Sequence, residues 1–143
     1  MAIDQAFCNS FKLELVQANH DFSSDTLMLA LYDRSTASLG PTTTAYTATG
    51  EASGTGYTAG GKEISVSSGY PQANSSIASQ IDIRFDSVEW LSATFTAGAG
   101  LIYNASLSNA AIAVLDFGTN YTVTNGTFTV TFPTTSPATF IFR

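Results

Sequence analysis

The sequence is poor in charge and in reactive side chains. Lys, Arg, Asp and Glu make up only 11% of its 143 residues, against about a quarter in an average globular domain. With a single Cys, an internal disulfide is excluded, and with a single His, acid–base chemistry has one imidazole available. The five basic residues are scattered and the net charge is −6, so we expect no direct binding to nucleic acid, which needs clustered Lys and Arg.

Long apolar runs are also missing. The longest, LMLAL at 27–31, is far shorter than the roughly 20 residues of a membrane-spanning helix, so we expect no membrane segment. The N-terminal MAIDQAFCNSFKLEL lacks the basic start and continuous apolar stretch of a secretory signal. We therefore expect the chain to stay in the cytoplasm of the cell that makes it.

What the chain does contain predicts one folded domain over residues 1–143. Hydrophobic residues reach 44%, enough apolar area to offset the ordering of the backbone. Ser and Thr are abundant, and hydroxyl groups are easier to desolvate in an interface than Lys or Glu. Because Thr also favours strands, the composition fits either a covered surface or simply a β protein.

One helix is predicted, over about residues 3–18. Ile3, Phe7, Phe11 and Leu15 recur every four residues, which is typical of a helix with one buried face. Cys8 lies beside the same stripe, and we interpret it as a small core side chain.

The chain from about 26 to 143 predicts an antiparallel β-sandwich, with a Greek-key barrel as the alternative. Short runs of β-branched and aromatic residues alternate there with Gly, Pro, Asn and Ser. The predicted strands are 26–32, 43–49, 62–67, 79–85, 92–96, 100–104, 111–117, 121–124, 127–132 and 139–142.

Two of these regions carry finer predictions. The pair Asn125-Gly126 separates 121–124 from 127–132 and predicts a tight hairpin, because a type I′ turn needs positive φ at both positions. Residues 80–86 alternate apolar and polar, so Asp82, Arg84 and Asp86 are predicted to form an exposed, ion-paired row on the wet face of a strand.

Residues 50–61, GEASGTGYTAGG, are too rich in Gly and Ser for an ordinary strand. The segment is either an arm that reaches another subunit or a flexible surface loop that joins two strands. A phosphate loop is excluded, because no Lys-Ser/Thr pair and no helical pattern follow the glycines.

The Cys, His, Asp and Glu residues show no pattern that predicts a catalytic or metal site. Cys8 and His20 are the only thiol and imidazole, but a regular helix would hold them about 18 Å apart along its axis. Asp82, Asp86 and Glu89 suggest calcium ligands or a glycosidase pair, and ion pairing explains them more simply. We therefore expect no enzyme activity, no catalytic residue, no metal site and no cofactor.

Several segments carry a resemblance. The segments MAIDQAFCNSFKLEL, HDFSSDTLMLALYD, EASGTGYTAGG, ATFTAGAGLIYNAS, AIAVLDFG and GTFTVTFP together resemble a family of small virion structural proteins of tailed bacteriophages and prophages, along nearly the whole chain. The resemblance implies a protein that assembles in the host cytoplasm and resides in the virion. Within the particle, a capsid decoration or cement protein is the favoured role, and a neck, tail-tube or tail-tip component is the alternative.

In that role the expected partners are the major capsid protein and further copies of the chain. We expect the copies of the chain to form a homotrimer. The contacts would come from the N-terminal segment, the loop 50–61 and the C-terminus. The residues expected to make them are Phe7, Phe11, Tyr57, Gly60, Gly61 and Arg143.

A hypothesis of a different class is a carbohydrate- or receptor-binding module. Such a module would stack sugar rings on Trp90, Tyr57 or Tyr70, because aromatic faces bind the apolar side of a sugar. The other interpretation of Trp90 is a core residue at the edge of a strand.

Overall fold

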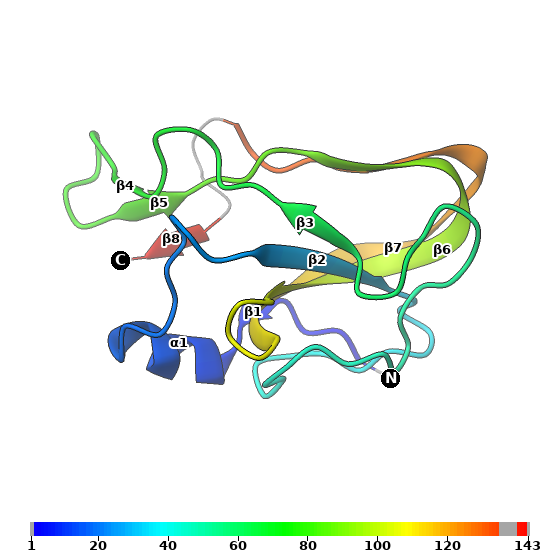
Figure 1. The fold of residues 1–143 in the computed structure, drawn as a ribbon, viewed down its shortest axis with the longest axis horizontal. Helices are drawn as coiled ribbons and strands as arrows, with labels where there is room; N and C mark the ends of the chain where they lie inside the picture. The colour runs from blue at the N-terminus through cyan, green and yellow to red at the C-terminus, as the bar shows by residue number, and fades with distance from the viewer. Residues whose placement is uncertain (1, 135–139, 143) are drawn as a thin grey trace.

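The computed structural model describes residues 2–134 and the backbone of residues 140–142 (Figure 1). The prediction of a mainly β fold with antiparallel sheets and one short N-terminal helix is confirmed. The elements in chain order are β1 (Ala6–Phe7), α1 (Asn9–Val16), β2 (Leu27–Tyr32), β3 (Lys62–Ile64), β4 (Gln72–Ala73), β5 (Ile81–Ile83), β6 (Val88–Asn104), β7 (Ala110–Val130) and β8 (Phe140–Phe142).

These strands form two sheets. The larger has the order β1-β7-β6-β2-β3, and the smaller has the order β4-β5-β8. Every pairing between the named strands is antiparallel. Within the described residues, no helix is long and apolar enough to cross a membrane.

The long hairpin of β6 and β7 dominates the fold. The two strands run side by side and curve together through the molecule, so that one half packs over the other elements (Figure 1). Five predicted strands, 92–96, 100–104, 111–117, 121–124 and 127–132, are therefore parts of only two. The sequence divides them because the breaks are β-bulges, which interrupt the pattern without ending the strand.

The curve of the hairpin follows from small residues at its bend. Residues 97–100 are alternating Ala and Gly, whose side chains are a single methyl group or a hydrogen, and all four are buried. A Cβ added at Gly98 would lie 2.7 Å from the side chain of Arg34. The small residues thus let neighbouring side chains approach the backbone closely, and larger ones would force the strands apart.

The hairpin predicted at Asn125-Gly126 is wrong. Asn125 does have positive φ, at 47°, but β7 continues through it and Gly126 pairs with Ala93 of β6. Between Ala93 and Phe95 the partner strand advances by three residues instead of two, so Asn125 lies at a bulge. The turn that joins β6 to β7 comes earlier, at Ser108 and Asn109, which have φ of 48° and 59°.

The helix is shorter than the predicted 3–18. Residues before it are extended, because Ile3 bridges Leu39 and β1 pairs with β7 at residues 113–114. Strand pairing satisfies these backbone groups, which leaves the helix only Asn9–Val16. Phe11 is its one buried residue.

Two predicted strands differ in the structure. Residues 43–49 form no strand and make only an isolated bridge, from Ala45 to Ala110. Residues 79–85 contribute only β5, and the predicted faces are partly reversed there. Ile81 is 43% exposed whereas Asp82 is 2% exposed, so Asp82 does not belong to an exposed row of charges.

The core is one cluster of buried side chains that draws on both halves of the hairpin. Its aromatic part lies between the halves, where Trp90 contacts Phe95 and Phe128 edge-on at 6.4 and 6.2 Å between ring centroids. Fully burying side chains of this size stabilises the fold by about 1.5–3 kcal/mol each. The core is therefore what holds the hairpin in its curved form.

Candidate interaction site

The glycine-rich loop folds back onto its own sheet. Ala52 donates to the Leu31 carbonyl, and the backbone amide of Thr94 donates to the carbonyl of Thr55. Gly56 has φ of 78°, and a Cβ there would lie 2.9 Å from the Cα of Ala93. Of the two predictions for residues 50–61, the structure has the surface loop, packed closely against β2 and β6, rather than an extended arm.

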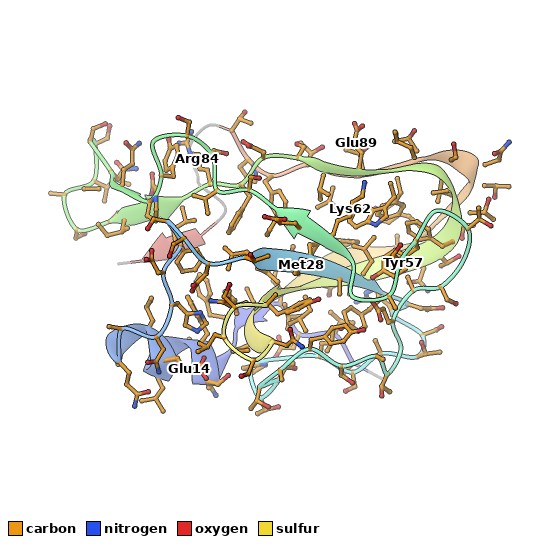
Figure 2. All side chains as sticks on the ribbon, in the orientation of Figure 1. Glu14, Met28, Tyr57, Lys62, Arg84 and Glu89 are labelled. Carbon is orange, nitrogen blue, oxygen red and sulfur yellow. The ribbon has the colours of Figure 1, made fainter. Side chains whose placement is uncertain are left out.

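Glu51 holds this loop together. Its carboxylate accepts hydrogen bonds from the hydroxyls of Tyr46 and Tyr57 and from the backbone amide of Gly60, each at 2.7 Å. Tyr103 then donates to the Gly60 carbonyl at 2.7 Å. We call these five residues the Glu51 cluster, and Figure 2 labels Tyr57, where the loop meets the sheet. The Glu51 carboxylate therefore has a structural role, which is to hold the loop in its folded form.

The tyrosines of this region are hard to ionise. Burial, reinforced by the neighbouring Glu51 carboxylate, raises the pKa of Tyr46 to about 12. Burial also raises the pKa of Tyr57 and Tyr32 well above the ordinary value for tyrosine. These hydroxyls therefore stay protonated at neutral pH and act as hydrogen-bond donors.

The predicted sugar-stacking platform on Trp90 is wrong, because that side chain is only 1% exposed. Tyr57 stacks on it with 6.2 Å between ring centroids. Lys62 passes over the indole at 6.0 Å and donates to the Glu89 carbonyl at 2.5 Å (Figure 2). Trp90 thus belongs to the core, where its ring has no face free for a sugar.

The third residue of that hypothesis, Tyr70, is half-buried, and one face of its ring is covered. The guanidinium of Arg84 lies over its ring, 4.8 Å from the centroid. Arg84 also donates to the carbonyl of Thr134. A sugar ring would have to displace the guanidinium to stack on that face of Tyr70.

His20 links the helix to the end of β6. Its Nε2 lies 2.9 Å from Glu14 Oε2, and its Nδ1 lies 3.1 Å from Asn104 Nδ2. Because the Asn104 amide nitrogen can only donate, it donates to His20 Nδ1, and His20 Nε2 donates to Glu14. Asn104, which is fully buried, also donates to Asp25 at 2.6 Å.

Cys8 lies apart from these contacts. Burial raises the pKa of its thiol to about 11, and its sulfur lies 4.0 Å from the Gly40 carbonyl. A thiol with so high a pKa is almost entirely protonated at neutral pH, and the thiolate is the nucleophilic form. The structure places Cys8 in the core, as predicted, and brings His20 to Glu14 and Asn104.

The carboxylates of 82–89 are dispersed. Asp82 accepts from Gln80 at 2.6 Å and from Asn74 at 2.8 Å, and these bonds lower its pKa. Asp86 accepts instead from the Ser67 hydroxyl. Across residues 2–134 no group of three or more His, Cys, Asp or Glu side chains is placed to hold a metal ion.

A further polar cluster fastens β7 to the end of β2. Arg34 makes a bidentate pair with Asp116, at 2.8 and 2.9 Å, which lowers the pKa of that carboxyl. The backbone amide of Arg34 donates to Asn120, and Asn120 donates to Asp33 at 2.7 Å. Asp116 is the last charged residue before Arg143.

The residues predicted to contact other subunits occupy different environments. Phe11 is fully buried against Phe22 and His20, so the chain's own core makes its contacts unavailable to a partner. Phe7 is half-buried, with its ring 5.7 Å from that of Phe11. Tyr57, Gly60 and Gly61 lie in the folded loop, whereas Arg143 falls outside the described residues.

The surface that sequence reasoning missed is the outer edge of β7. Residues 117–142 contain no Asp, Glu, Lys, Arg or His. A groove of about 460 Å³ runs along this part of the strand, with Phe117, Tyr121, Val123, Phe128 and Val130 among its lining residues. The signal was present as a long uncharged stretch, but the false hairpin at Asn125-Gly126 divided it.

Comparison with known protein families, curated proteins and solved structures finds no match for this chain.

Proposed function

We propose that the chain is a structural protein of a tailed-bacteriophage particle that decorates the capsid and stabilises it through protein–protein contacts. The observation that carries the proposal is the uncharged, grooved half of β7, residues 117–130, which offers a long surface that costs little to desolvate. The resemblance of the sequence to small virion proteins directs it to the phage particle.

The internal use of the polar side chains supports the same function. Glu51 accepts three bonds within its cluster, and His20 is engaged by Glu14 and Asn104. These groups hold the loops and the helix against the sheets. A rigid body of this kind suits a protein that acts by covering other surfaces, because a preorganised interface loses less entropy on binding.

A decoration protein acts through contact area, repeated by many copies of the protein over the capsid. A standard interface buries about 1,600 Å² in total, and repetition over a shell adds the stabilisation of each contact. The net charge of −6 would then face outward and repel nucleic acid and neighbouring particles.

The direct test is the copy number of this chain in purified particles. Hundreds of copies per particle support the capsid role, whereas about six to twelve copies would place the chain in the neck or tail instead. Complete absence from particles that carry their other structural proteins would overturn the virion function.

A second arm tests the stabilising action. Particles that lack the chain are heated with and without added purified protein, and release of DNA is followed by dye fluorescence. We expect the added protein to raise the release temperature. An unchanged release temperature despite saturated binding would contradict a cementing role.

A further inference from the structure

The outer edge of β7 has no described partner along most of its length. β1 pairs with it only at Ala113 and Val114. Beyond Val114, no strand among residues 2–134 and 140–142 pairs with that edge, while the inner edge stays paired with β6 as far as Val130. The amides of Asp116 and Gly118 are bonded to the side chains of Gln5 and Asp116. Beyond them the outer edge presents backbone donors and acceptors that no described strand pairs, which is a template for another strand.

The opposite border of the larger sheet is protected in the usual way. β3 has three residues, and its exposed positions are Lys62 and Glu63. Short length and charge both discourage a foreign strand from adding to an edge. β7 has neither protection from Phe117 onward, since its side chains there are hydroxyl, amide, aliphatic or aromatic.

The groove lies along the same stretch. Tyr121 is 53% exposed at one end, and the half-buried Val123 and Phe128 line it further along. A strand laid against this edge would cover these apolar surfaces at the same time as it satisfies the backbone. Both gains come from one contact, as in recognition by strand addition.

We propose that a second copy of this chain occupies the edge, with the two β7 strands antiparallel across a two-fold axis. The inference rests on the proposed structural function and names one of its contacts. Two chains of net charge −6 repel each other wherever charged surfaces meet, so close approach needs uncharged surface on both sides. The half of β7 after Asp116 provides such a surface on each copy.

The bulge at Asn125 selects the register. It divides the edge into two straight runs, residues 121–124 and 127–130. A two-fold axis beside Asn125 sets each run opposite the other run of the second copy, so that Tyr121 faces Thr129 and Val123 faces Thr127. This arrangement lets the bulges coincide and avoids a kinked run facing a straight one.

Sedimentation velocity of the purified full chain, over about a hundredfold range of concentration, tests the contact. We expect a monomer–dimer equilibrium. Hydrogen exchange on the same samples should show protection of residues 119–130 that rises with concentration, because pairing buries amides that an open edge leaves to solvent. A strict monomer, or association without that protection, would overturn the inference.

Charge variants give the matched comparison. Tyr121→Lys and Thr127→Lys place charges on the edge, and we expect each to raise the dimer dissociation constant at least about tenfold, because pairing would desolvate the charge against an uncharged residue of the second copy. Leu91→Lys is the control, since Leu91 is 62% exposed on β6, away from that edge. Equal weakening by all three variants, or by none, would contradict edge pairing.

The outcomes separate this inference from the proposed function. A chain found in many copies on particles but strictly monomeric in solution would remove the edge contact and leave the virion function standing. A chain that dimerises through β7 but is missing from particles would do the reverse. Association that protects another surface, such as a trimer formed through the loop 50–61, would replace the β7 contact.

Discussion

Replacing Glu51 with alanine should loosen the glycine-rich loop. The carboxylate accepts three hydrogen bonds of 2.7 Å, from Tyr46, Tyr57 and Gly60. At about 1 kcal/mol for each bond, Glu51→Ala should lower the free energy of unfolding by about 3 kcal/mol. For a chain of this length that loss corresponds to a fall in Tm of about 9 °C.

Urea denaturation and calorimetry measure the change. Glu51→Gln keeps an acceptor oxygen and should lose less than half as much stability. Glu63→Ala is the control, because Glu63 is exposed on β3 and a surface substitution of this kind should change stability by less than about 0.5 kcal/mol. If Glu51→Ala and Glu63→Ala were equally mild, the Glu51 cluster would not organise the loop.

Three further predictions concern the tyrosines, the buried amide and the single tryptophan. The free energy of unfolding should fall as pH rises from about 10 towards 12. The cause is that tyrosines of the unfolded chain lose their phenolic protons near pH 10, while folded Tyr46, with a pKa of about 12, keeps its proton. Ultraviolet absorbance follows the titration, and ionisation of all tyrosines near pH 10 in the folded state would contradict the prediction. Asn104→Ala should lower the free energy of unfolding by about 3 kcal/mol, because it leaves His20 and Asp25 without their shared donor, whereas the exposed Asn19→Ala should be nearly neutral in the same urea titration. Fluorescence of Trp90 should be blue-shifted and shielded from iodide until the chain unfolds; strong quenching in the folded state, or by added sugars, would argue against its burial.

Periodicity in the sequence was sufficient to predict the class of fold but not the lengths of its strands. Residues 27–32 form β2 close to the predicted bounds, because a run of buried aliphatic residues is unambiguous. In β6 and β7 the bulges near Ala93 and Asn125 imitate strand ends. A turn and a bulge both use positive φ, so Asn125-Gly126 could not be assigned from local sequence alone.

The polar clusters were hidden for a different reason. Glu51 and Gly60 lie nine residues apart, but His20 and Asn104 are separated by 84 residues and meet only in the folded chain. Asp82 appeared to be a surface charge because it alternates with Ile81 and Ile83. Its burial depends on amides from Asn74 and Gln80, which neutral side chains supply without any signal in the charge pattern.

The composition carried more about the surface than the motifs did. The composition shows that charged residues are scarce, and the sequence alone shows that residues 117–142 contain none. What the letters could not show is that half of β7 lies at an open edge, because that depends on β1 ending its pairing at Val114.

A low-resolution image of the intact particle, with this chain carrying a visible label, tests the central claim most directly. We expect label at regular positions over the whole capsid. Label confined to a single vertex or to the tail would contradict the decoration role, and particles without any label would contradict a structural function in the virion.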